Sequence, residues 1–134
     1  MLNITVQVPD LSRFTADVTA RVDRAVAETA EAAANDAKAS MAMSKSGTIY
    51  KRRGISHQAS APGEPPALDI GRLVGSVRVT RLGSMRWAMG PNTEYAEALE
   101  YGTRKMGARP FLRPAVERAR PVFMAKVLEA LRQR

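Results

Sequence analysis

The sequence predicts an α+β domain in which a small, mainly antiparallel sheet packs with a long N-terminal helix, a short middle helix and a C-terminal helix. Two periodicities predict this class. Apolar residues recur at three- and four-residue steps near both ends of the chain, and they alternate with polar residues in shorter segments. The length of 134 residues and the hydrophobic content of 45% suit a single domain, 1–134, with a modest core.

The first two predicted elements are a strand over residues 2–8 and a helix over residues 11–42. Pro9 ends the strand, and Asp10 is a candidate N-cap for the helix. Such a helix would be roughly 48 Å long, which is more than a domain of this size usually buries. Its far end is rich in alanine, so it belongs either to an ordinary core or to a contact with another subunit.

Residues 44–66 follow neither periodicity and predict a flexible basic arm. Serine, glycine and proline accumulate there around Lys45, Lys51, Arg52, Arg53 and the single histidine, His57. A structureless segment of this length in a small domain is either a solvated loop or an arm that orders when it meets its partner.

Residues 76–89 predict a β-hairpin with Gly83 and Ser84 in its loop. In the register that this loop favours, the facing pairs are Leu82 with Met85, Thr80 with Trp87, and Val79 with Ala88. Both faces would then be partly apolar, so the sheet would need cover on both sides from helices or from a neighbouring subunit.

The last two predicted elements are helices. Asn92 or Thr93 can cap a short helix over residues 94–100, with Gly102 as its stop. After a break at residues 107–110, Pro114 suits the first turn of the final helix. Pro121 lies inside that helix and predicts a kink or a restart.

Charge is distributed unevenly along the chain. Residues 1–43 carry four Lys/Arg and six Asp/Glu, a net charge of −2, and residues 44–134 carry seventeen against seven, a net charge of +10, which together give the +8 of the chain. A basic segment implies an anionic neighbour, which is nucleic acid, an acidic protein surface or the acidic segment of another copy.

The residues needed for common enzyme chemistry are missing. There is no cysteine, and His57 has no evident partner for a metal site or a catalytic triad. Arg104 and Lys105 follow the glutamates of the middle helix and favour salt bridges over acid-base chemistry. We therefore expect no enzyme activity, no metal, no cofactor and no small-molecule substrate.

Membrane and sequence-specific DNA binding are not predicted either. No apolar run reaches the roughly 20 residues of a membrane helix, and the N-terminus does not resemble a signal peptide, so we expect synthesis in the cytoplasm. The chain has no recognised DNA-binding motif and only 5% aromatic residues, which leaves nonspecific contact with DNA as the open alternative.

Two stretches carry a family resemblance. The first is Ser-Ala-Pro-Gly-Glu-Pro-Pro-Ala at residues 60–67, followed by Asp-Ile-Gly-Arg-Leu at 69–73. The second contains Tyr95-Ala96, Leu-Glu-Tyr-Gly-Thr at 99–103 and Ala-Arg-Pro-Phe-Leu-Arg-Pro-Ala at 108–115. In this order they resemble a family of small tail proteins of long-tailed bacteriophages, the neck or tail-completion group, which is also similar to lambda's minor tail protein Z.

The resemblance implies a structural virion protein that is made in the host cytoplasm and joins head to tail by protein-protein contacts. It implies a ring of identical copies, hexameric by the usual tail symmetry, with neighbouring neck and tail proteins as further partners. Tail completion is the favoured position, and a tail terminator, a stopper beneath the portal and a basic nucleic-acid-binding module remain alternatives. The arm residues Lys45, Lys51, Arg52 and Arg53 would contact a partner or genome DNA.

The motif residues are the candidate subunit or neck interface. They are Tyr95, Glu100, Tyr101, Gly102, Thr103, Arg109, Pro110, Phe111, Leu112 and Arg113. Pro110 and Pro114 hold the second motif rigid, so Phe111 and Leu112 either anchor a partner or fill the core of this domain itself.

Overall fold

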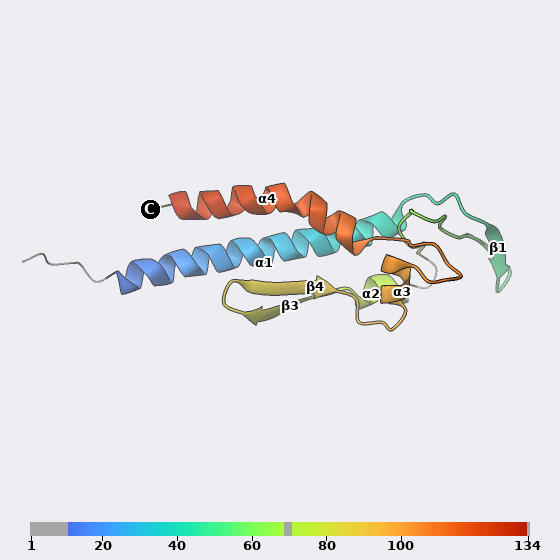
Figure 1. Cartoon of the computed structure of the whole chain (residues 1–134), viewed down its shortest axis with the longest axis horizontal. Coiled ribbons are helices and arrows are strands. Elements are labelled where there is room, and N and C mark those ends of the chain that lie inside the picture. Colours follow the sequence, from blue (N-terminus) through green and yellow to red (C-terminus); the bar gives the residue numbers. More distant parts are fainter. Residues whose placement is uncertain (1–10, 69–70, 134) are drawn as a thin grey trace, which may run out of the picture.

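The computed structural model describes residues 11–68 and 71–133. Within these ranges the elements are α1 Ser12–Ala42, β1 Ile49–Arg52, β2 Ile55–Gln58, α2 Arg72–Ser76, β3 Arg78–Gly83, β4 Arg86–Gly90, α3 Ala96–Tyr101 and α4 Leu112–Arg132 (Figure 1). The strands form two separate antiparallel pairs, β1-β2 and β3-β4, and the predicted α+β class is confirmed. The strand predicted over residues 2–8 and the Asp10 cap lie outside the described residues.

Helices α1 and α4 lie side by side and antiparallel (Figure 1). The side chains that join them are the pairs Arg118–Asp36 and Lys126–Glu28, both at 2.7 Å, and Arg21, which donates to the carbonyl of Gln133. From one contact to the next, the residue number falls along α1 by as much as it rises along α4, as expected for two antiparallel helices. Because α4 ends opposite Arg21, residues 11–20 of the long helix and its N-cap extend beyond α4, and we call this segment the overhang.

The β3-β4 hairpin packs along α1 on the side away from α4 (Figure 1). The predicted register was wrong by one residue. The observed partners are Val79 with Met89, Thr80 with Ala88, Arg81 with Trp87 and Gly83 with Arg86. The loop moves by one position because the hairpin is irregular between Arg81 and Gly83, and Met85 adopts a left-handed φ of 54°.

The shift in register changes what the two faces of the hairpin carry. Val79, Trp87 and Met89 gather on one face, which packs towards α1, whereas Thr80 and Ala88 are exposed on the other. The expectation that both faces need cover was therefore wrong for the paired strands. One helix covers the single apolar face.

The prediction that residues 44–66 lack structure was also wrong. Strands β1 and β2 form a hairpin at the end of the molecule opposite the overhang (Figure 1). Its two-residue turn uses Arg53 and Gly54, both with positive φ, and the rings of Tyr50 and His57 stack 5.7 Å apart. Two left-handed central residues match the natural twist of a hairpin, a signal that the basic composition obscured.

Helices α3 and α4 follow the prediction in outline. α3 begins at Ala96, two residues later than predicted and without a side-chain cap, and Gly102 ends it as expected. Pro114 lies in the first turn of α4, and the helix continues without a restart through Pro121. Pro121 is exposed, so water can reach the carbonyl that loses its hydrogen bond there.

The core lies where the C-terminal half of α1 meets α2, α3 and the start of α4. It consists of Ala34, Ala37, Met41, Leu73, Val77, Ala96, Phe111 and Ala115. The alanine-rich end of α1 therefore belongs to the core of this chain, because small side chains let the other elements approach closely. Among the described residues, no helix is both long and apolar enough to cross a membrane.

Candidate assembly interface

The two motifs of the family resemblance meet in space at the end of α1, and we call this region the motif junction. The backbone N–H of Gly63 donates to the carbonyl of Ala108 at 2.8 Å, and the Arg109 guanidinium donates to the carbonyl of Ser60 at 3.1 Å. Gly107 packs so closely that an added Cβ would lie 2.8 Å from Pro62. The junction is thus a tight contact that combines a backbone hydrogen bond, a side-chain hydrogen bond and close packing of Gly107 on the Pro62 ring.

Glu64 ties the base of the β1-β2 hairpin to the first motif. Its carboxylate accepts the backbone N–H of Ala61 at 2.8 Å, the backbone N–H of Ser46 at 3.1 Å and the Ser46 hydroxyl. These hydrogen bonds, with that of the Ser46 hydroxyl the strongest cause, hold the pKa of Glu64 below its usual value.

Glu100 performs a similar task for the second motif. Its buried carboxylate accepts the backbone N–H groups of Phe111 at 2.9 Å, Leu112 at 3.0 Å and Arg113 at 2.8 Å. These donors lie at the start of α4, where a helix has no acceptors of its own. A carboxylate there also interacts favourably with the helix dipole. Glu100 is therefore the cap of α4, supplied by α3.

Gly102 makes this capping geometry possible. It adopts φ 78° and donates its N–H to the carbonyl of Ala98 at 2.8 Å. A Cβ at this position would lie 2.8 Å from the nitrogen of Ala108. Only glycine combines that φ with that approach, so the chain turns back immediately after α3 and brings Glu100 to α4.

The predicted interface residues differ in how much of each side chain is exposed. Glu100 and Phe111 are buried within the chain, and Gly102, Arg109, Pro110 and Leu112 are partly buried. Phe111 fills the core of this domain, which was one of the two readings of the motif. The exposed members are Tyr95, Tyr101, Thr103 and Arg113, and Tyr101 is 75% exposed. These four are the part of the predicted interface that a partner can reach.

Lys45 lies apart from the other three basic residues of the predicted arm. The Lys45 ammonium donates to the carbonyl of Ser40 at 2.8 Å, next to the C-terminal end of α1, and burial lowers its pKa. Lys51, Arg52 and Arg53 are exposed on the β1-β2 hairpin. Lys45 therefore holds the end of a helix, and the other three remain the basic surface.

A pocket of about 380 Å³ opens between the motif junction and the β1-β2 hairpin. Met41, Leu73 and Leu99 give it apolar walls, and Tyr50 and Tyr95 also line it. The pocket has the size and lining to accept an apolar side chain from a partner.

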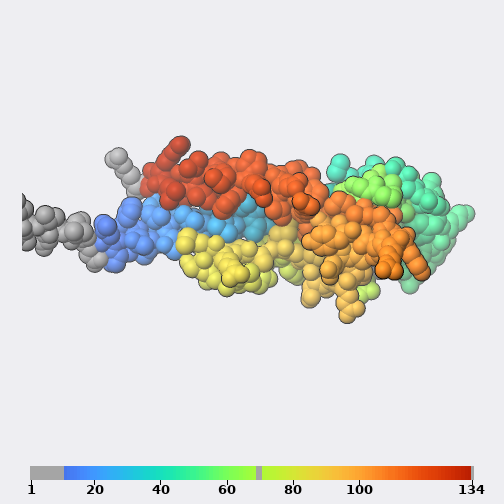
Figure 2. Space-filling model, in the orientation of Figure 1, coloured from blue at the N-terminus to red at the C-terminus, as the bar shows by residue number. Residues whose placement is uncertain are grey.

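A second recess, which sequence reasoning missed, runs along α1 between α4 and the β3-β4 hairpin, and we call it the central groove. Figure 2 shows the strip of α1 that forms its floor, with α4 on one side and the hairpin on the other. The groove measures about 330 Å³. Its lining is almost wholly apolar or small: Val26, Thr29, Ala30, Ala33, Trp87, Met89, Val116, Ala119 and Phe123, with Arg120 as the one charged residue.

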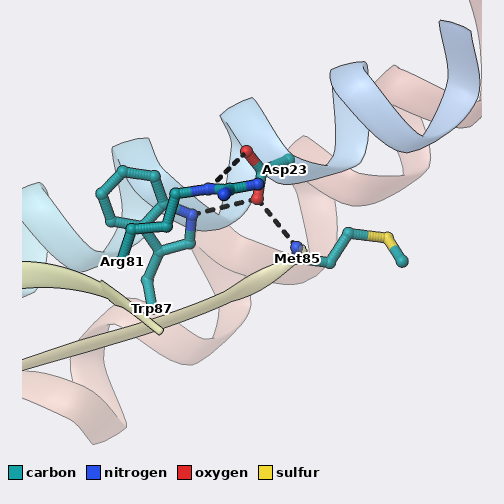
Figure 3. A network of polar contacts seen from close by, with 4 residues as sticks. All are labelled: Asp23, Arg81, Met85 and Trp87. Carbon is teal, nitrogen blue, oxygen red and sulfur yellow. Dashed lines mark hydrogen bonds and ion pairs between the residues drawn. The ribbon is translucent and has the colours of Figure 1, made fainter. Parts of the chain in front are cut away.

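Asp23 holds the hairpin wall of the central groove in place (Figure 3). Its carboxylate accepts the backbone N–H of Met85 at 2.8 Å and the indole N–H of Trp87 at 3.1 Å, and it pairs with the Arg81 guanidinium at 3.5 Å. The indole hydrogen bond, followed by that from Met85, lowers the pKa of Asp23.

The acidic side chains of the described residues serve mainly as hydrogen-bond acceptors within the fold. The described residues contain no group of three or more histidine, aspartate or glutamate side chains that could hold a metal ion. The carboxylates with the most hydrogen bonds, Asp23, Glu64 and Glu100, accept backbone N–H groups and hold the fold together. No protein-family model, curated protein or solved structure matches this chain, so the resemblance to the phage neck family stays a prediction.

Proposed function

We propose that this protein is a structural component of a bacteriophage neck, a tail-completion or head-tail connector protein that acts through protein-protein contacts in a ring of identical copies. The observation that carries the proposal is the amount of apolar surface left uncovered. Among the described residues, sixteen large hydrophobic side chains are exposed, whereas only Phe111, Met41 and Val77 are large and fully buried. Grouped apolar surface of this kind is typical of proteins that associate.

The uncovered side chains fall into separate surfaces. Leu11 and Phe14 lie on the overhang, and Met124, Leu128 and Leu131 lie on the part of α4 outside the central groove. Val116 lines the groove itself, and Ile49 and Ile55 lie on opposite faces of the β1-β2 hairpin. A subunit in a ring needs two different surfaces, because one patch meets a different patch on the next copy. The motif junction supports this role by giving the chain a rigid end.

The uneven charge contributes less to assembly than the sequence suggests. Three of the acidic residues of α1 pair within the chain: Asp23 with Arg81, Glu28 with Lys126 and Asp36 with Arg118. Asp17 and Glu31 are the other acidic residues of α1, and both are exposed. Contacts between acidic and basic parts of two copies would therefore involve few charges, and apolar burial would be the larger contribution.

The test is the mass of the purified chain in solution, measured by light scattering at low and high salt, with and without DNA. A closed assembly that forms without DNA and survives high salt supports a ring built on apolar contacts. A monomer that associates only when DNA is added contradicts the proposal.

One observation favours a second candidate function, nonspecific nucleic-acid binding. Lys51, Arg52 and Arg53 lie on a two-stranded hairpin at one end of the molecule, and no acidic residue occurs between Asp36 and Glu64. A two-stranded ribbon fits the major groove of DNA, and such cations would contact phosphates.

Charge reversal separates the two functions. The triple change Lys51→Glu, Arg52→Glu and Arg53→Glu should abolish DNA binding and leave assembly intact if the hairpin contacts DNA. Arg104→Glu with Lys105→Glu is the matched control, because these cations are exposed elsewhere on the chain. Failed assembly with unchanged DNA affinity would assign the hairpin to a protein partner.

A further inference from the structure

We propose that the overhang of one copy docks into the central groove of the next copy, head to tail. This inference rests on the proposed function, since it names the contact that would build the ring. The occupant of the groove is a second copy of this chain, because the overhang and the groove match in shape and length and can bring opposite charges together.

The overhang presents a helical face on which the rest of the described chain leaves Leu11 and Phe14 exposed, whereas Val18 is partly buried. Leu11, Phe14 and Val18 are spaced as i, i+3 and i+7, which places them on one side of a helix. They continue the stripe of α1 that further along packs against α4 and the hairpin, but α4 ends opposite Arg21. Leu11 is 54% exposed and Phe14 is 63% exposed, although both are typical core residues.

The central groove has the form that such a helix needs. Ala30 and Ala33 in its floor are small enough for a second helix to approach closely, and Trp87 and Phe123 stand in opposite walls. The floor from Val26 to Ala33 and the stripe from Leu11 to Val18 have the same length, about 10 Å of helix. Docking would thus place three apolar anchors against an apolar channel, the usual mode of helix-in-groove recognition.

One pair of opposite charges can meet at the same place, on surfaces that also carry Arg13 on the overhang and Glu97 and Glu117 in the recess beside the groove. Among the described residues, Arg120 is the one charged side chain that lines the groove, and it also lines an adjoining recess of about 690 Å³ that continues towards α3. On the overhang, exposed Asp17 lies between Phe14 and Val18 in the sequence. A docked overhang can therefore bring Asp17 to Arg120 at the edge of an apolar contact, where the pair would set orientation.

The contact must be between copies. Phe14 and Ala30 belong to the same continuous helix, so they stand about 24 Å apart within one chain. The overhang cannot fold back into its own groove while α1 remains helical. Because the two surfaces differ, each copy can donate an overhang and accept another, and the chain of contacts closes if the rotation permits.

Disulfide trapping tests the contact directly, because the natural chain has no cysteine. A Phe14→Cys chain and an Ala30→Cys chain are mixed and oxidised, with each variant oxidised alone as a control. We expect linked dimers to form mainly in the mixture. Leu82→Cys mixed with Ala30→Cys is the matched negative control, because Leu82 is equally apolar and 55% exposed but lies outside both surfaces.

Two substitutions test the energetics by light scattering. Phe14→Glu should weaken association roughly ten- to hundredfold, as expected for losing one large buried side chain. Asp17→Arg should weaken it, and Arg120→Asp in the same chain should restore it. Leu82→Glu is the control that should leave association unchanged.

The outcomes separate this contact from the proposed function. Association of the natural chain without the Phe14–Ala30 cross-link, or association unaffected by Phe14→Glu, overturns the docking and leaves the ring proposal in place. Cross-linking of Phe14→Cys chains alone would replace it with a symmetric overhang contact. A natural chain that stays monomeric under all conditions overturns both proposals.

Discussion

Replacing Glu100 is the sharpest test of how the two motifs work. The sequence placed this residue in an interface, whereas the structure makes it the internal cap of α4. It is 8% exposed and accepts three backbone N–H groups, from Phe111, Leu112 and Arg113. The change Glu100→Ala leaves all three without their acceptor.

The expected cost follows from those three hydrogen bonds. A hydrogen bond to a charged group contributes about 1.5–3 kcal/mol when buried, and loss of a helix cap costs about 1 kcal/mol. Water can reach part of the opened site, so we expect Glu100→Ala to lower the free energy of unfolding by about 3 kcal/mol. For a chain of 134 residues, this corresponds to a fall in Tm of about 10 °C.

Glu100→Gln should cost less than Glu100→Ala, about 2 kcal/mol. Its amide oxygen can still accept two N–H groups, but its NH₂ group would face the third donor. Glu97→Gln is the matched control, because Glu97 lies on the same helix and is exposed. We expect the control to change stability by less than about 0.5 kcal/mol.

Urea and thermal unfolding, followed by circular dichroism, measure all three variants. If Glu100→Ala is as stable as the Glu97→Gln control, Glu100 does not stabilise the start of α4. If the Glu100 variants keep normal stability but no longer self-associate, the original assignment of this residue to an interface would stand instead.

The remaining predictions concern the hairpins and the turn after α3. Because the pKa of Asp23 is lowered in the folded chain, its contribution to stability is complete above its ordinary value of 3.8 and is lost as the pH falls through the lower folded value. Fluorescence of Trp87, the only tryptophan, should therefore change in acid, and Asp23→Asn should remove that step; an unchanged acid step in this variant would contradict the assignment. Gly102→Ala should destabilise the fold by about 1–3 kcal/mol by thermal unfolding, whereas Gly75→Ala, with open space around its Cβ, should not; equal effects would refute the strain argument. Amide hydrogens of the β1-β2 hairpin should exchange rapidly in the free chain and slowly in the assembly, because an isolated two-stranded hairpin is marginally stable; strong protection in the free chain would count against ordering on assembly.

Local sequence patterns predicted the elements whose cause is local. The 3.6-residue period predicted the long helix to its last residue, Ala42, and glycine predicted the end of α3 at Gly102. The position of the β3-β4 hairpin was also predicted, because alternation and a loop signal are properties of neighbouring residues. The short β1-β2 hairpin was missed, since its Arg53-Gly54 turn is a weak local signal inside a polar segment.

The candidate site was predicted only in part. The sequence identified the segments around Tyr101 and Arg113 that reach the surface, but it also assigned Glu100 and Phe111 to the interface. It gave no sign of the central groove, because the walls of that groove come from β4 and α4, which are distant in sequence.

What the sequence alone determined is the secondary structure that short-range geometry dictates, together with the absence of cysteine and the basic character of the second part of the chain. Tertiary structure decided the rest. Asp23 accepts the backbone N–H of Met85, 62 residues further along the chain, in the observed register of the β3-β4 hairpin. Glu100, on α3, caps the next helix, α4. The pairing of α1 with α4 decided which apolar faces are covered and which, like that of Phe14, stay exposed. These contacts depend on which surfaces, distant in sequence, pack together. Periodicity shows only which side chains lie on each face of a helix or strand.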